Sequence, residues 1–210
     1  MAYSDFTVRK VKQSFGIITI EGGRFLPEID PISPSGMLVE FLEETLPLAV
    51  ALPSEKAKSE LLISPILVEV RKMLRREVSL FSGQDFTVDA SVGLSGTCDF
   101  LMSRSREQFE IEAPVVVIVE AKRADLNLGM GQCMAEMVAA QQFNQSANME
   151  AVTIYGCVSS GMLWRFLKLD GNEVTIDLED YSIKPVDRLL GILVWMAAGT
   201  TIPHPRDCTN

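Results

Sequence analysis

The segment 114–119, a proline followed by an unbroken run of valine and isoleucine, constrains the fold more than any other part of the chain. β-branched side chains favour strands, and a strand that is apolar on both faces belongs in the middle of a covered sheet. The run continues directly into Glu120, Ala121 and Lys122. Charged groups at the end of so apolar a strand are costly unless they have partners. The segment therefore predicts both a central strand and a polar site at its end.

The periodicity on either side of this run predicts an α/β fold, a mixed sheet with helices on its faces. Ser54 is a candidate N-cap for a helix that Pro65 either kinks or restarts, with Ser64 as a second N-cap. The other expected elements of this part are strands 78–90, 94–102 and 114–119, a helix at about 130–146 that starts from Asn127 or Gly129, a strand 152–158, a hairpin 164–169 and 173–178, and an apolar helix 186–198.

The chain is expected to divide into an N-terminal extension of strands and a helix packed on the core, a main domain and a polar tail, at residues 1–52, 53–202 and 203–210. Within the extension, the β-rich composition of residues 6–20 predicts a strand. Ser35 is expected to cap a helix that runs to about Ala51, although Pro47 leaves the end of that helix open.

The composition argues against several classes of protein. A net charge of −9 disfavours a broad nucleic-acid-binding surface but not a nuclease, whose metal site is itself acidic. The four cysteines form no CxxC pair and the single histidine, His204, lies in the tail, which disfavours a zinc site or a histidine-dependent triad. The longest apolar stretch, residues 189–198, is about half of a membrane span. With no signal peptide visible, the expected location is the cytoplasm.

A second acidic residue, Asp99, lies in the predicted strand that precedes the apolar run. Glu120 and Lys122 share a face because side chains alternate along a strand. If the two strands are antiparallel neighbours, Asp99 lies beside Glu120, and a hard divalent cation would relieve the repulsion between the carboxylates. Asp99, Glu120 and the Ala121 carbonyl would then bind Mg²⁺ or Mn²⁺. Lys122 would orient an attacking water or stabilise charge on phosphorus.

In the order of these features the chain resembles the PD-(D/E)XK nuclease superfamily over about residues 54–170. It is most similar to the N-terminal nuclease domains of type I restriction enzyme R subunits and their stand-alone relatives. There, a helix with a glutamate and a Leu-Ile-x-Pro-x-Leu stretch precedes the strands, and residues 62–67 read Leu-Ile-Ser-Pro-Ile-Leu. The resemblance implies a restriction-endonuclease-like core of helix, three strands, helix and strand, and a Mg²⁺-dependent endonuclease that acts on nucleic acid, with DNA favoured over RNA as the substrate and the choice left open.

The resemblance also adds candidate site residues. The helical glutamate of such nucleases has two counterparts, Glu55 and Glu60, and both qualify. R subunits carry Gln-x-x-x-Tyr on the helix after Glu-x-Lys; this chain keeps the glutamine as Gln132 and has Glu136 in place of the tyrosine. No G-x-x-x-x-G-K-[ST] phosphate loop occurs, so this chain would not couple cleavage to ATP.

Three interpretations follow. The first is a Mg²⁺-dependent endonuclease, favoured by the intact set of Asp99, Glu120 and Lys122. The second is a catalytically silent member of the same fold that binds nucleic acid or protein, favoured by the charge of −9 and by Glu136. The third is an oligomeric module whose acidic cluster binds an ion, with the apolar helix 186–198 as a homodimer surface.

Overall fold

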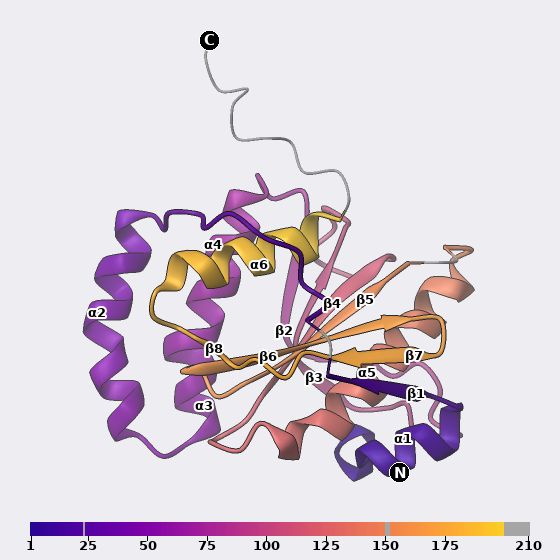
Figure 1. Cartoon of the computed structure of the whole chain (residues 1–210). Coiled ribbons are helices and arrows are strands. Elements are labelled where there is room, and N and C mark those ends of the chain that lie inside the picture. The colour runs from indigo at the N-terminus through magenta and orange to yellow at the C-terminus, as the bar shows by residue number, and fades with distance from the viewer. Residues whose placement is uncertain (23, 150–151, 200–210) are drawn as a thin grey trace.

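A mixed β-sheet crosses the molecule and carries helices on both faces (Figure 1). The computed structural model describes residues 1–22, 24–149 and 152–199. The strands are β1 (Ile18–Glu21), β2 (Ser79–Asp85), β3 (Thr97–Ser103), β4 (Val115–Ala121), β5 (Ile154–Ser159), β6 (Leu163–Asp170), β7 (Glu173–Ile176) and β8 (Tyr181–Ser182). They lie in the order β1-β7-β6-β5-β4-β3-β2, with β8 paired to β6. The β1–β7 and β4–β5 pairs are parallel and the other pairs are antiparallel.

The helical elements are η1 (Tyr3–Asp5), α1 (Val8–Phe15), α2 (Gly36–Ala51), α3 (Glu55–Lys58), the π-helical turn η2 (Ser59–Ile63), α4 (Ser64–Met73), α5 (Asn127–Ser146) and α6 (Val186–Ala198). One face of the sheet packs against α5, over which α1 lies, and the other face packs against α4 and α6, with α2 outside them (Figure 1). Each face has its own cluster of buried apolar side chains. Because β4 lies between both clusters, it is buried along its whole length, as its valine and isoleucine content predicts.

The α/β class and the elements of the main domain are confirmed, with bounds that differ by a few residues from the predicted ones. The largest difference in this part is β2, which ends at Asp85 instead of Ala90. The chain then turns through a loop that an isolated bridge between Asp89 and Leu94 closes. No described helix is both long and apolar enough to cross a membrane.

The prediction of a strand over residues 6–20 is wrong for most of that segment. Residues Val8–Phe15 form α1, and only Ile18–Glu21 are a strand. The Thr7 side chain caps α1, Gly16 ends it in the left-handed conformation, and the apolar residues inside recur at helical spacing. These signals outweigh the β-branched content. The described part of residues 1–52 (1–22 and 24–52) therefore contains two helices, a short 3-10 turn and one strand, and that strand joins the sheet beside β7.

Both proline positions lie inside helical backbone. Pro47 interrupts nothing, because α2 begins at the Ser35 cap, as predicted, and continues to Ala51. Before Pro65 the helix widens into the π-helical turn η2, in which the Ser64 N–H bonds to the Ser59 carbonyl. Proline has no N–H and its ring crowds the preceding turn, which such a widening accommodates. Ser64 is thus within the helix, and its predicted role as an N-cap is wrong.

The apolar helix at the C-terminal end of the described chain, α6, is buried within the molecule. Its leucine, isoleucine, valine and methionine side chains pack against α4 and the sheet, and only Trp195 and its ends are partly exposed. The prediction that residues 186–198 present an apolar homodimer surface is therefore wrong, since the chain itself covers that surface. The predicted polar tail, residues 203–210, lies outside the described residues.

Candidate functional site

Glu120 and Lys122 lie at the end of β4, on the face of the sheet that α5 covers. Val119 and Ala121 pack into the apolar cluster beneath α2, α4 and α6, whereas Ile118 packs into the cluster beneath α5. Since side chains alternate between faces, Glu120 follows Ile118 to the α5 side. The Glu120 side chain is 1% exposed and that of Lys122 is 17% exposed. A carboxyl group and an amine therefore meet in a mostly buried position.

Asp99 reaches the same place from β3. The two strands are antiparallel neighbours, as predicted, with Phe100 opposite Val119. Beyond that pair, the Ala121 N–H of β4 donates its hydrogen bond to the side chain of Asp99 instead of to the β3 backbone, with Oδ2 as the acceptor at 2.8 Å. The Glu120 carboxyl lies within hydrogen-bonding reach of Asp99. The structure thus brings Asp99 and Glu120 together at the end of β4.

The Ala121 carbonyl is directed to the same side as Asp99. In a strand, the N–H and C=O of one residue point towards the same neighbouring strand, and the Ala121 N–H points to Asp99 on β3. The N–H of Lys122 points the other way, to the Ser159 carbonyl of β5 at 2.7 Å. Asp99 and the Ala121 carbonyl therefore both lie on the β3 side of β4.

Helix α5 closes the site through Gln132. Its Nε2 donates to Glu120 Oε2 at 2.9 Å and to Glu136 Oε1 at 3.1 Å. The other oxygen of Glu120, Oε1, is paired with the Lys122 amine. We refer to Asp99, Glu120, Lys122 and Gln132 as the carboxylate site. All four were candidates from the sequence, whereas the burial of Glu136 behind them was not anticipated.

The carboxyl groups of the site are held towards their neutral forms. Burial, and then the charge of Asp99, raise the pKa of Glu120 to about 8. Burial also raises the pKa of Asp99, against the opposing effects of the Ala121 N–H and of Lys122. For Lys122, burial lowers the pKa, but the charge and hydrogen bond of Glu120, together with the charges of Glu55 and Asp99, raise the pKa on balance. A single amine thus compensates the site incompletely, and added positive charge would favour the ionised carboxylates.

The structure separates the two helical glutamates. Burial is the main cause of the raised pKa values of Asp99 and Glu120, and the charge of Glu55, in the first turn of α3, adds a smaller effect in the same direction. Glu60 instead forms an exposed ion pair with Lys56, with the amine and carboxylate 3.7 Å apart. Of the two glutamates, Glu55 is the one whose charge acts on Asp99 and Glu120.

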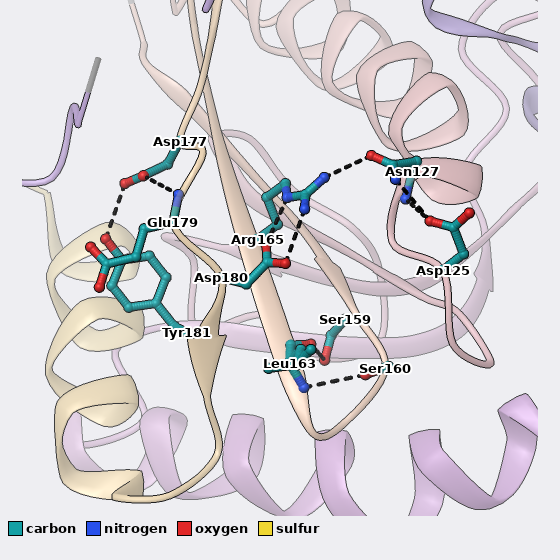
Figure 2. A network of polar contacts seen from close by, with 10 residues as sticks. All are labelled: Asp125, Asn127, Ser159, Ser160, Leu163, Arg165, Asp177, Glu179, Asp180 and Tyr181. Carbon is teal, nitrogen blue, oxygen red and sulfur yellow. Dashed lines mark hydrogen bonds and ion pairs between the residues drawn. The ribbon is translucent and has the colours of Figure 1, made fainter. Parts of the chain in front are cut away.

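A second polar network, which the sequence did not reveal, ties the first residue of α5 to β6 (Figure 2). Arg165 lies one strand beyond Val158, the residue that pairs with Glu120 across the sheet. Its guanidinium contacts both oxygens of Asp180, at 2.7 and 3.0 Å, and donates to Asn127 Oδ1 at 2.8 Å. The network fixes the start of the helix that carries Gln132. Only the alternation along β6 could have placed Arg165 on this face.

Two glycines let α5 approach its neighbours. A Cβ on Gly129 would lie 2.7 Å from a methyl of Val158 and 2.9 Å from Cγ of Lys122. A Cβ on Gly131 would lie 2.4 Å from the Phe6 carbonyl oxygen. These residues are therefore required for close packing of α5 on β4, β5 and the N-terminal segment, which brings Gln132 within reach of the strand.

Comparison with known proteins gives no relative: no protein-family model and no curated protein sequence matches the chain. Within residues 1–22, 24–149 and 152–199, no group of three or more His, Cys, Asp or Glu side chains is arranged to hold a metal ion. Of the three oxygen donors expected from the sequence, Asp99 and Glu120 are side chains and the third is the Ala121 carbonyl. Cys98, Cys133 and Cys157 are buried free thiols, and Cys208 lies outside the described residues.

Proposed function

We propose that the chain is a Mg²⁺-dependent endonuclease-like protein that hydrolyses phosphodiester bonds in DNA, with the fold and site of the PD-(D/E)XK superfamily. The observation that carries the proposal is the convergence of Asp99, Glu120 and Lys122 at the end of β4. Residues of these types, placed on adjacent strands, combine hard oxygen donors with a cationic group.

The order of elements around the site supports the same proposal. A helix that carries Glu55 precedes three consecutive antiparallel strands, β2, β3 and β4; α5 then leads to β5, which pairs with β4 in parallel. This is the helix, three strands, helix and strand order that the resemblance implies. Asp99 lies on β3 and Glu120 on β4, the second and third of these strands, and Gln132 lies on α5, the second helix of this order.

The donor set fits Mg²⁺ or Mn²⁺. Carboxylate and carbonyl oxygens are the ligands that these ions prefer, and Asp99, Glu120 and the Ala121 carbonyl supply them. The raised pKa values of Asp99 and Glu120 support a cation as well, because its charge would offset their mutual repulsion. A bound metal ion would polarise the phosphodiester and make a bound water more acidic.

The residues of the chain would divide the remaining work. Lys122 reaches the site from the same face as Glu120 and would stabilise negative charge that develops on the phosphate. Gln132 holds one oxygen of Glu120 and so fixes the orientation of that carboxylate. Glu55 adds negative charge close to the site without being buried in it.

A catalytically silent protein of the same fold, which binds nucleic acid or another protein, is the second candidate. Two observations favour it. The net charge of −9 leaves little cationic surface for a phosphate backbone. In addition, Glu136 occupies the position where R subunits have a tyrosine, and it is buried instead of facing a nucleotide.

The test is cleavage of supercoiled plasmid and of single-stranded DNA, with Mg²⁺, with Mn²⁺ and with a chelator. We expect metal-dependent cleavage by the wild type and a loss of at least about 100-fold in rate for Lys122→Ala, the size of effect seen when a group that stabilises transition-state charge is removed. Lys168→Ala is the matched control, because Lys168 forms an ion pair with Asp170 on β6, away from the site. It should cleave at the wild-type rate.

The outcomes distinguish the candidates. Cleavage that persists in Lys122→Ala would indicate a contaminating nuclease and would contradict the proposal. Binding of Mn²⁺ and DNA by the wild type without cleavage would favour the silent protein. Calorimetry with Asp99→Ala completes the test, since a site that binds metal through Asp99 should lose most of its affinity in that variant.

A further inference from the structure

Helix α5 carries a carboxyl group, Glu136, that is buried directly behind the carboxylate site. Its side chain is 0% exposed. Oε1 accepts one hydrogen bond, from Gln132 Nε2 at 3.1 Å. Within the described chain, Oε2 has no hydrogen-bond partner. Such groups are uncommon in native proteins, because a buried polar atom without a partner destabilises the fold.

Burial, and then the charge of Glu120, raise the pKa of Glu136 against the smaller opposing effects of Gln132 and Lys122. The neighbours of Glu136 include the buried thiols of Cys98 and Cys133 and the phenol of Tyr3. The Tyr3 hydroxyl donates to the Phe86 carbonyl instead of to Glu136. An apolar side chain would suit these surroundings better than a carboxyl group. The local structure thus gives no reason in terms of stability for a glutamate at this position.

The hydrogen bond between Glu136 and Gln132 connects Glu136 to the carboxylate site. The amide nitrogen of Gln132 has two hydrogens, and its contacts with Glu136 Oε1 and Glu120 Oε2 use both. Because residues 132 and 136 are four apart on α5, they lie on one face of the helix. Glu136 therefore fixes the rotation of the Gln132 amide so that the second hydrogen points at Glu120.

We infer that Glu136 is a positioning residue that holds the Glu120 carboxylate in place for metal binding, through Gln132, at a cost in stability. The inference rests on the proposed function of the carboxylate site. In this role Glu136 acts on another residue of the protein, the proposed metal ligand Glu120. Residues that orient ligands in this way typically change metal affinity by about 10- to 100-fold when they are replaced.

Two substitutions separate positioning from a structural role. Glu136→Leu removes the acceptor for Gln132 and also removes the unpartnered oxygen, so we expect a protein at least as stable as the wild type that binds Mn²⁺ about 10- to 100-fold more weakly. Glu136→Gln keeps an acceptor oxygen of the same shape, so its affinity should stay close to that of the wild type, with no gain in stability. Affinity is measured by calorimetry, and stability by urea unfolding of the metal-free protein.

Met137→Leu is the matched control. It changes the next residue of α5, a fully buried side chain that packs on Gly156 on the sheet side of the helix. We expect wild-type Mn²⁺ affinity for this variant. Glu136→Leu with wild-type affinity would overturn the inference. So would a Glu136→Leu variant that is less stable than the wild type and loses no more affinity than Met137→Leu.

A readout without metal keeps this inference separate from the proposed function. The side-chain amide protons of Gln132, assigned in a nitrogen–proton NMR spectrum with Gln132→Ala, should exchange slowly in the wild type and in Glu136→Gln and rapidly in Glu136→Leu. If the wild type binds no Mn²⁺, the proposed function fails, and the exchange rates still test the positioning. Equal exchange in the wild type and Glu136→Leu would overturn it.

Discussion

Helix α5 contacts β4 through an amide side chain at each end, and the two contacts differ in kind. At one end, the Asn144 amide accepts from the Val115 N–H at 2.8 Å and donates to the Val115 carbonyl at 2.7 Å. At the other end, the Gln132 amide bridges Glu120 and Glu136. Both contacts join an amide side chain of the same helix to the same strand; Asn144 is buried and Gln132 is half-buried.

The difference lies in how completely each contact is satisfied. The Asn144 contact pairs a donor and an acceptor of the backbone with an acceptor and a donor of the side chain, and it involves no charge. The Gln132 contact gathers carboxyl groups whose pKa values are raised, with one amine to oppose them. Groups that are perturbed in this way concentrate at functional sites. The first contact thus serves the fold, and the second is the one on which the proposed function depends.

The largest effect is expected for a variant that removes the Asn144 contact with Val115. Asn144→Leu leaves the buried N–H and C=O of Val115 without partners, each at a cost of about 1–3 kcal/mol, so the free energy of unfolding should fall by about 2–4 kcal/mol. Mn²⁺ affinity at the other end of the helix should stay within about twofold of the wild type, because separate sites act nearly independently. Urea unfolding and calorimetry measure the two quantities.

Gln145→Ala is the control for Asn144→Leu. It changes the next residue of the same helix turn, which is exposed, and should alter the free energy of unfolding by less than about 0.5 kcal/mol. If Asn144→Leu weakened Mn²⁺ binding by an order of magnitude while the protein remained folded, the two ends of the helix would not be independent and the contrast would fail.

The second test concerns the pH dependence of stability in the metal-free protein. The pKa of Glu120 is about 8 in the folded state, above its ordinary value of 4.5. Between these values the unfolded chain releases a proton that the folded chain keeps, so the free energy of unfolding should decrease as pH rises from about 4.5 to about 8. The raised pKa values of Asp99 and Glu136 act in the same direction. Glu120→Gln should make the profile flatter.

Urea unfolding at pH 5, 6, 7 and 8 measures this profile. The matched variant is Asn144→Leu, which should be less stable at every pH but keep the wild-type slope, since it removes no titrating group of the site. A wild-type profile that rises between pH 5 and 8 would mean that Glu120 is ionised in the folded protein over this range, and the incomplete compensation inferred for the site would be wrong.

The sequence predicts the strand side of the site better than the helix side. Alternation along the apolar run places Glu120 and Lys122 on one face, and antiparallel pairing of neighbouring strands places Asp99 beside them; β3 and β4 have that arrangement. Both steps use local rules of strand geometry. The rotation of α5 about its axis is not local, because it depends on packing at Gly129 and Gly131. The burial of Glu136 therefore could not be read from the sequence.

For the N-terminal residues the prediction failed for the opposite reason, because it relied on composition although local signals for a helix were present. β-branched content alone predicts a strand over residues 6–20, but the capping residues Thr7 and Gly16 and the spacing of Val8, Val11 and Phe15 specify a helix. These signals were present in the sequence and outweigh composition. By contrast, nothing local indicates that Arg165 pairs with Asp180 and Asn127, because three distant segments meet there.

The smallest expected effect separates the two glutamates of the helix before β2. Glu55→Gln removes a charge that acts on Asp99 and Glu120, so Mn²⁺ affinity should fall by about 2- to 5-fold, as for a partly screened charge of about 0.5–1 kcal/mol. Glu60→Gln breaks only the exposed pair with Lys56 and should leave affinity unchanged. Calorimetry at low and high salt measures both, and the Glu55 effect should shrink with salt because ions screen exposed charges. A larger loss of Mn²⁺ affinity for Glu60→Gln than for Glu55→Gln would mean that Glu60, and not Glu55, is the glutamate that acts on the carboxylate site.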